Sequence, residues 1–436
     1  MAKIGYHQPM SKLDISTSRT KSGLTIVRIN LPNFHTITNF LAIRSGSRYE
    51  TSENNGIAHF LEHMVFKGTE KYPDTAAISQ AIESVGGYFN AWTSLDHTCY
   101  WNIVSAASWQ LGIEVVFQLA YRALLREEDL ERERGVIIEE IRRIQDDPAS
   151  YVDDLSGGLL FDGNPLARPI IGTEKNIKAM TIEQFKQYRL RHYNPSQSLF
   201  IAIGNLENLP IDSVVEQQIA DFKAQEQSVF EPVTVPSSSG LKLINKSTDQ
   251  THFILGVSDP VLSMKDDQSY VGEVLNTILG RGMSSRLFLN VREKQGLAYA
   301  IHSSLMTLED TGAVAIYGGV NTGKVELALK AVDEEIAKLK NEKVGDKELK
   351  KAKAMVAGSY DIKADEPIEL AKWYGIGTLL HRQETFEEAR AKIEAVTAAQ
   401  VQKLAQTILA KDRQTLAVIG PYDSDKIFTD FLSHTD

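Results

Sequence analysis

The chain contains an internal repeat, and this repeat limits its possible folds more than any other feature. The stretch TIEQFKQYRLRHYNPSQSLFIAIGN begins at Thr181, and TAAQVQKLAQTILAKDRQTLAVIGP begins at Thr397, an offset of 216 residues (397 − 181). Each stretch reads as a helix with a threonine N-terminal cap, followed by an apolar strand that ends at Gly204 or Gly420. The match predicts two copies of one structural unit in a single chain.

A polar segment separates the two copies. Residues 223–240, KAQEQSVFEPVTVPSSSG, are rich in Pro, Ser and Gln and lack helical periodicity, which is typical of a linker. The sequence therefore predicts an N-terminal domain over residues 1–222 and a homologous C-terminal domain over residues 241–436. We expect an α+β fold in which each domain is an antiparallel β-sheet covered by α-helices.

The composition argues against several classes of protein. The formal net charge is −10, and acidic residues lie near the Lys/Arg clusters, so no nucleic-acid-binding surface is predicted. No run of about 18 uncharged apolar residues is present that could span a membrane. The first 14 residues resemble neither a signal peptide nor a mitochondrial transit peptide. We therefore expect a cytoplasmic protein that binds neither nucleic acid nor membrane.

Apolar periodicity divides the first half into short strands and helices. Strands are expected at residues 24–30 and 38–44, and a strand pair at 88–94 and 97–105. Helices are expected at residues 55–67, 74–87, 107–123 and 127–145.

The expected helix 55–67 carries the stretch GIAHFLEHMVFKGT, which contains His59, Glu62 and His63. Residues four apart lie on one helix face, so both imidazoles can face one point, and neutral imidazoles suit zinc. Glu62 is too near this pair to serve easily as a third ligand, but it is suited to accept a proton from water. The order His-x-x-Glu-His is the thermolysin motif reversed. A pair of core histidines held by hydrogen bonds is the structural alternative.

The expected helix 127–145 offers further carboxylate ligands. With Val136 at zero and about 100° per residue, Glu140 falls near 40° and Glu133 near 60°, within the apolar stripe. Glu139 falls near 300°, on the solvent side. A carboxylate that faces a core is costly unless it meets a cation or a metal. A buried Arg or Lys partner is one explanation, and the two converging histidines favour a metal.

The spacing of these residues resembles the pitrilysin and mitochondrial processing peptidase family of inverted zincins. His59-x-x-Glu62-His63 is followed, after 76 intervening residues (140 − 63 − 1), by Glu140. The resemblance implies that His59, His63 and Glu140 bind one Zn²⁺ per chain and that Glu62 is the general base. It also implies that Glu133, seven residues before Glu140, supports the site.

Two further segments extend the resemblance. Residues 85–100, VGGYFNAWTSLDHTCY, look like the family's substrate-binding edge strand, whose backbone at Asn90 and Ala91 would pair with an extended peptide. Residues 280–299, GRGMSSRLFLNVREKQGLAY, look like the segment that supplies an arginine and a tyrosine to the active site, here Arg292 and Tyr299. An ordinary hairpin and purely structural side chains are the alternatives.

The resemblance implies a zinc endopeptidase that hydrolyses peptides or unfolded polypeptide segments inside an enclosed chamber. It further implies a clam-like homodimer, in which Arg292 and Tyr299 of one subunit reach the zinc site of the other. One alternative is a catalytically silent scaffold subunit, like the processing-peptidase-like core subunits of respiratory complexes. Another is a metallohydrolase that does not act on peptides.

Overall fold

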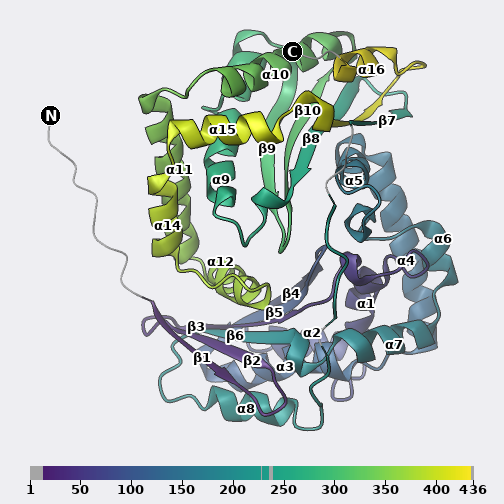
Figure 1. Cartoon of the computed structure of the whole chain (residues 1–436). Helices are drawn as coiled ribbons and strands as arrows, with labels where there is room; N and C mark the ends of the chain where they lie inside the picture. The colour runs from purple at the N-terminus through teal and green to yellow at the C-terminus, as the bar shows by residue number, and fades with distance from the viewer. Residues whose placement is uncertain (1–12, 227, 235–238, 434–436) are drawn as a thin grey trace, which may run out of the picture.

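The computed structural model describes residues 13–226, 228–234 and 239–433. The first 12 residues, where neither a signal peptide nor a transit peptide is expected, lie outside this part. So do residues 227 and 235–238 of the expected linker. The described residues form two β-sheets, one from each half of the chain, drawn one above the other in Figure 1. None of their helices has the length and apolar content that a membrane crossing requires.

The first sheet has the strand order β1-β2-β6-β3-β5-β4 and the second has the order β7-β11-β8-β10-β9. The strands are β1 (Asp14–Arg19), β2 (Thr25–Asn30), β3 (Thr36–Ile43), β4 (Tyr88–Thr93), β5 (Thr98–Ser105), β6 (Ser198–Gly204), β7 (Gly240–Asn245), β8 (Gln250–Asp259), β9 (Ala298–Thr307), β10 (Gly312–Asn321) and β11 (Thr415–Gly420).

Helices cover both sheets. Those of the first half are α1 (Ile57–Val65), α2 (Thr75–Glu83), α3 (Trp109–Arg122), α4 (Glu127–Asp146), α5 (Pro148–Leu160), α6 (Glu174–Ala179), α7 (Ile182–His192) and α8 (Ile211–Gln218). Those of the second half are α9 (Gln268–Leu279), α10 (Val325–Asn341), α11 (Asp346–Ala364), α12 (Pro367–Leu370), α13 (Gly377–Leu379), α14 (Phe386–Ala395), α15 (Ala398–Ile408) and α16 (Lys426–Ser433), with π-helical turns at Leu287–Lys294 and Ala371–Ile376.

The two sheets have the same topology, which confirms two homologous α+β units. The order β2-β6-β3-β5-β4 in the first half corresponds to β7-β11-β8-β10-β9 in the second, and β1 is an addition to the first. The expected threonine caps are present, because Thr181 and Thr397 each form a reciprocal capping box, with Gln184 and Gln400. The boundaries at residues 222 and 241 stay a prediction.

One pairing in each sheet departs from the expected antiparallel arrangement. Strands β2 and β6 pair in parallel, as do β7 and β11, whereas the other pairings are antiparallel. In each half the later strand of the parallel pair comes after most of the helices. The connection between the two is therefore long enough for the crossover that parallel strands require.

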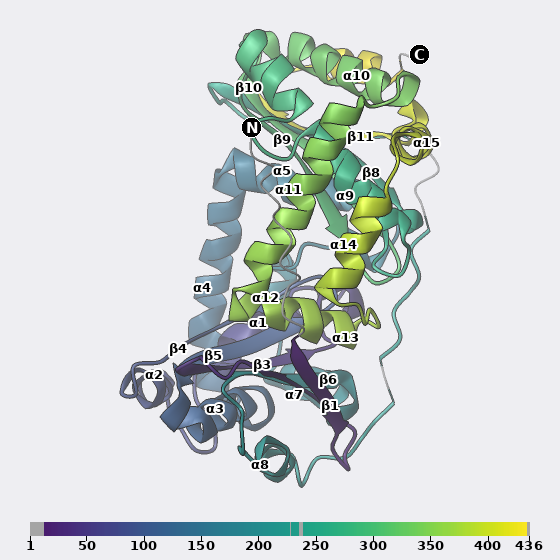
Figure 2. The same cartoon turned by 90° about the vertical axis from the view of Figure 1, so that its left-hand side faces the viewer.

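Each half contributes a helical segment that packs on the sheet of the other half. Val152 of α5, from the first half, packs on Ile254 and Ile419 of the second sheet. In return, the turn Ala371–Ile376 lies on the first sheet, where a Cβ on Gly375 would be 3.4 Å from Ile201. The repeat offset of 216 carries residues 148–160 onto 364–376, so these are corresponding segments. Figure 2 shows α4 and α11 running between the levels of the two sheets.

Candidate metal centre and substrate edge

The helix α1 begins at a position that only glycine fits. Gly56 has a φ of 100°, and a Cβ there would lie 2.7 Å from the carbonyl oxygen of Ile171. The buried carboxylate of Glu50 accepts hydrogen bonds of 2.8 Å from the backbone N–H groups of Gly56 and Ala58. Burial raises the pKa of Glu50 to about 7, although these hydrogen bonds lower it. A carboxylate from outside the helix thus satisfies its first N–H groups and fixes its start.

His59, His63 and Glu140 lie together where α1 meets α4. One ligand atom of each lies within 4.8 Å of the others. The Nε2 atoms of His59 and His63 are 4.0 and 3.8 Å from Oε2 of Glu140. Burial, with a smaller contribution from His63, lowers the pKa of His59 to about 4, so this ring is neutral at pH 7. Two imidazoles and one carboxylate at these distances fit Zn²⁺.

Glu133 orients one of the histidines. Its Oε1 lies 2.9 Å from Nδ1 of His63, and its Oε2 lies 2.6 Å from Nζ of Lys67. Burial would raise the pKa of Glu133, but the hydrogen bonds from His63 and Lys67 and the charge of Lys67 together lower it. An ionised Glu133 accepts a hydrogen bond from Nδ1–H of His63, which leaves Nε2 of His63 free to bind a metal. The sequence did not predict a role for Lys67, although Lys67 follows His63 by four residues, the spacing of one helical turn.

Glu62 borders the same cluster. The hydroxyl of Thr93, on β4, donates a hydrogen bond of 2.6 Å to Oε2 of Glu62. Burial raises the pKa of Glu62, and the bond from Thr93 and the nearby His63 oppose this effect. A carboxyl group with a raised pKa is a stronger base for water. Thr93 was also missed, although strand alternation places it on the same face as Ala91.

The strand β4 forms one edge of the first sheet and pairs with β5 alone among the described residues. Asn90 is exposed and Ala91 is half-buried, and the side chain of Asn90 accepts a hydrogen bond of 2.8 Å from the backbone N–H of Ala91. An edge strand with a free side can pair with an extended peptide. Thr93 therefore links this free edge strand to the carboxylate of Glu62.

Arg292 and Tyr299 are not brought to this cluster within the chain. Arg292 lies on the π-helical turn Leu287–Lys294 and contacts Phe288 and Glu293. Tyr299 is 75% exposed on β9. Within the described ranges, neither residue forms a hydrogen bond, ion pair or ring contact with His59, Glu62, His63 or Glu140.

Tyr299 has an irregular backbone position at the edge of the second sheet. Ala298 pairs with Val320 and Ala300 with Gly319, so Tyr299 has no partner residue on β10 and forms a β-bulge. Bulges re-aim a side chain and are common beside active sites. Its exposed ring is thus available to another molecule.

The two faces of α4 give a direct test of the ligand assignment. Glu140 faces the histidines, whereas Glu139 is 72% exposed and pairs with Arg142. We expect Glu140→Gln to lower zinc content strongly, because the amide is a much weaker ligand, and Glu139→Gln to leave it nearly unchanged. Metal analysis of the purified variants checks this prediction. Equal zinc content in both would contradict the assignment of Glu140.

Two family models match adjoining parts of the chain. Residues 25–174 match "Insulinase (Peptidase family M16)", and residues 179–356 match "Peptidase M16 inactive domain". The first match contains α1 and α4, which carry the metal cluster. The second contains Arg292 and Tyr299 but no second His-x-x-Glu-His sequence.

Relatives match over nearly the whole chain. An uncharacterized zinc protease of Streptomyces coelicolor is 35% identical over 92% of this chain and 88% of its own length. An uncharacterized zinc protease of Bacillus subtilis is 32% identical over 92% of this chain and 97% of its own length. The crystal structure of a protease from Helicobacter pylori has the same fold, with a TM-score of 0.89, 21% identity and coverage of 94% and 100%. The chain belongs to the pitrilysin family of zinc peptidases, peptidase family M16, as a short two-domain member of bacterial type.

Proposed function

We propose that this protein is a zinc endopeptidase that hydrolyses peptides or unfolded polypeptide segments inside the chamber of a clam-like homodimer. The observation that carries the proposal is the convergence of His59, His63 and Glu140 beside Glu62, which Thr93 ties to the free edge of β4. The names of the relatives support a zinc peptidase. A cytoplasmic location stays a prediction.

Each group of site residues has its own role in the proposed hydrolysis. A zinc ion held by His59, His63 and Glu140, one per chain, would polarise the scissile carbonyl and lower the pKa of a water molecule. Glu62 takes a proton from the attacking water and returns it to the leaving amine nitrogen, so no net proton is consumed. The edge of β4 holds the peptide extended, which keeps the scissile bond beside Glu62.

Removal of the metal tests the proposed function. We expect the purified protein to contain zinc and to cut an internally quenched peptide, to lose this activity on chelation, and to recover it when zinc is returned. Metal analysis and the fluorescence assay on the same samples provide the measurement. A protein that binds zinc but cuts none of a broad set of quenched peptides would favour the silent scaffold instead.

A homodimer gives the second half a role in catalysis. Tyr299 is exposed on its bulge and, among the described residues, has no contact with its own chain's cluster, and Arg292 is also partly exposed. In the proposed dimer these two side chains belong to the partner's site. There they would donate hydrogen bonds to the substrate carbonyl oxygen as it gains negative charge.

Mixed dimers distinguish action in trans from action within one chain. We expect Glu62→Gln and Tyr299→Phe to be nearly inactive as separate proteins. A dimer with one copy of each should be active if Tyr299 acts in trans, because one of its sites then combines an intact Glu62 with an intact Tyr299. Co-expression with two tags, tandem purification and the peptide assay provide the measurement. An inactive, zinc-loaded mixed dimer would exclude the trans arrangement and leave the peptidase assignment in place.

A further inference from the structure

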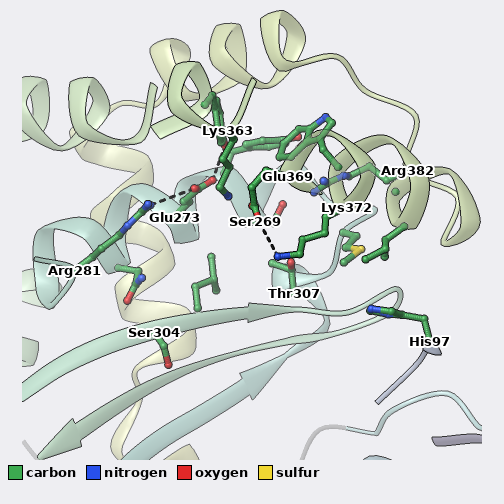
Figure 3. A pocket seen from close by; sticks show the side chains of 18 of the residues that line it. His97, Ser269, Glu273, Arg281, Ser304, Thr307, Lys363, Glu369, Lys372 and Arg382 are labelled. Carbon is green, nitrogen blue, oxygen red and sulfur yellow. Dashed lines mark hydrogen bonds and ion pairs between the residues drawn. The ribbon is translucent and has the colours of Figure 1, made fainter. Parts of the chain in front are cut away.

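A cavity of about 570 Å³ lies apart from the metal cluster, mainly in the second half of the chain. Its walls come from α9, the edge strand β9, α11, α12 and the turn Ala371–Ile376. His97, in the turn between β4 and β5 of the first half, closes one side (Figure 3). The cavity is therefore formed where the two halves of the chain meet.

Cationic side chains outnumber carboxylates in the cavity wall. The cations are Arg281, Lys363, Lys372 and Arg382, and the carboxylates are Glu273 and Glu369. The formal charge of the lining, with His97 neutral, is +2 (4 − 2), in a chain whose formal charge is −10. A positive hollow on an acidic protein attracts anions.

The two carboxylates are already engaged. Glu273 accepts a hydrogen bond of 2.6 Å from the hydroxyl of Tyr360 and lies 3.5 Å from Arg281. Glu369 accepts a hydrogen bond of 2.6 Å from Lys372. These contacts leave the charge of the remaining two cations unbalanced.

Arg382 and Lys363 carry the unbalanced charge. In the part of the chain that the structure describes, no carboxylate lies within ion-pair distance of either side chain. The guanidinium of Arg382 lies over the ring of Trp373, 4.2 Å from its centroid, which holds its plane in place. In the view of Figure 3, Lys363 lies near Glu273, whereas Lys372 and Arg382 lie at the end nearer His97. A flat, half-buried guanidinium is suited to a carboxylate.

The end of the cavity near His97 reaches the proposed substrate edge. Nζ of Lys372 lies 5.5 Å from the ring centroid of Trp92, on β4, and the indole N–H of Trp92 donates a hydrogen bond of 3.4 Å to His97. Trp92 precedes Thr93, which binds Glu62. Successive residues of a strand point to opposite faces, so Thr93 points toward the base and Trp92 points toward the cavity.

We propose that the cavity binds a carboxylate of the peptide substrate, with Arg382 as its principal contact. The inference rests on the proposed function, because it requires a peptide paired with the edge of β4. Alternate side chains of that peptide point toward the Trp92 face, which is the side on which Lys372 of the cavity wall lies. Carboxylates are the anions of an unmodified peptide, and they come from Asp or Glu side chains or from the C-terminus. The protein therefore prefers substrates with a carboxylate within a few residues of the scissile bond.

Matched quenched peptides test this preference. The reference peptide has no acidic residue and an amidated C-terminus. A second set places one Glu at successive positions on either side of the cut, and a third peptide is the reference with a free C-terminus. We expect one of these carboxylates to raise kcat/KM by about tenfold or more, as for a hydrogen bond to a charged group. We also expect tighter binding of that peptide to the inactive Glu62→Gln protein, measured by fluorescence anisotropy.

Variants at the cavity assign the preference to its wall. We expect Arg382→Met to remove most of the preference and Arg382→Met with Lys363→Met to abolish it, while hydrolysis of the reference peptide stays unchanged. This unchanged activity also shows that the variants fold. Lys186→Met, on α7 and away from the cavity, is the matched control and should keep the full preference.

The outcomes separate this inference from the proposed function. A preference for the internal Glu identifies a side chain as the ligand, and a preference for the free C-terminus identifies the terminal carboxylate. Equal kcat/KM for all peptides would overturn the inference and leave the peptidase assignment standing. A preference that survives in the double variant would overturn it as well. If the zinc-loaded protein neither binds nor cuts any of the peptides, the proposed function fails and this inference fails with it.

Discussion

Glu62→Gln should lower the rate of peptide hydrolysis by at least ~10², while zinc content stays at the wild-type level. The amide has the shape of the carboxylate but cannot take a proton from water. Among the described residues, Glu62 forms no hydrogen bond or ion pair with His59, His63 or Glu140, so the metal ligands do not depend on such a bond. The kcat of a quenched peptide and the zinc content of the same sample provide the measurement.

A variant at the neighbouring hydroxyl is the control for this result. Thr93→Val keeps the carboxylate of Glu62 and removes the hydrogen bond of 2.6 Å to it. A hydrogen bond to a charged group contributes about 1.5–3 kcal/mol. Because Thr93→Val keeps the base itself, we expect a loss on the order of tenfold, smaller than that of Glu62→Gln. A Glu62→Gln protein that keeps its zinc and nearly full activity would remove Glu62 from the role of base. Loss of zinc in this variant would instead indicate a structural role.

Local periodicity predicts much of the candidate site. The expected helix at residues 127–145 is α4, Glu127–Asp146, because its apolar stripe and its first-turn acids are local features. Glu133 and Glu140 both lie toward the metal cluster, and Glu139 lies in solvent. Val136, the zero of the helical wheel, is 51% exposed, and the buried face is centred nearer Ile137. Angles on a helix follow from spacing alone, and so they can be predicted.

The repeat predicts the fold in the same way, but it does not predict the parallel pairings or the exchange of α5 for the turn Ala371–Ile376. Which strand lies beside β2, and which sheet a helix covers, depends on the tertiary packing of the whole domain. For the same reason, contacts between residues distant in sequence cannot be predicted from local patterns. Thr93 on Glu62 and Lys372 over Trp92 have no signature in spacing.

The family resemblance supplies Arg292 and Tyr299, which no pattern in the residues could have identified. Among the described residues, neither contacts His59, Glu62, His63 or Glu140. In the proposed homodimer they act on the partner's site, and the mixed-dimer experiment tests this arrangement.

A charged contact joins the two halves of the chain, and it gives the largest expected effect on stability. The side chain of Arg44, at the end of β3, is 7% exposed, and it lies 2.5 Å from Glu309, which is 3% exposed and lies between β9 and β10. Lys265 also reaches Glu309, at 2.8 Å. A second ion pair, between Arg48 and Asp310, runs beside the first at 2.9 Å. The two halves thus meet through charges that are largely shielded from water.

Glu309→Gln should lower the free energy of unfolding by about 3–5 kcal/mol, because it leaves the buried charge of Arg44 without a carboxylate. Urea unfolding followed by tryptophan fluorescence and by circular dichroism provides the measurement, and two probes are needed because the halves could unfold in separate steps. The control is Glu183→Gln, whose partner Lys186 is also exposed, and its effect should stay within about 0.5 kcal/mol. Arg44→Met in the Glu309→Gln background should restore part of the loss, since it removes the unpaired charge. An effect of Glu309→Gln no larger than that of Glu183→Gln, or no recovery in the double variant, would show that this ion pair does not hold the halves together.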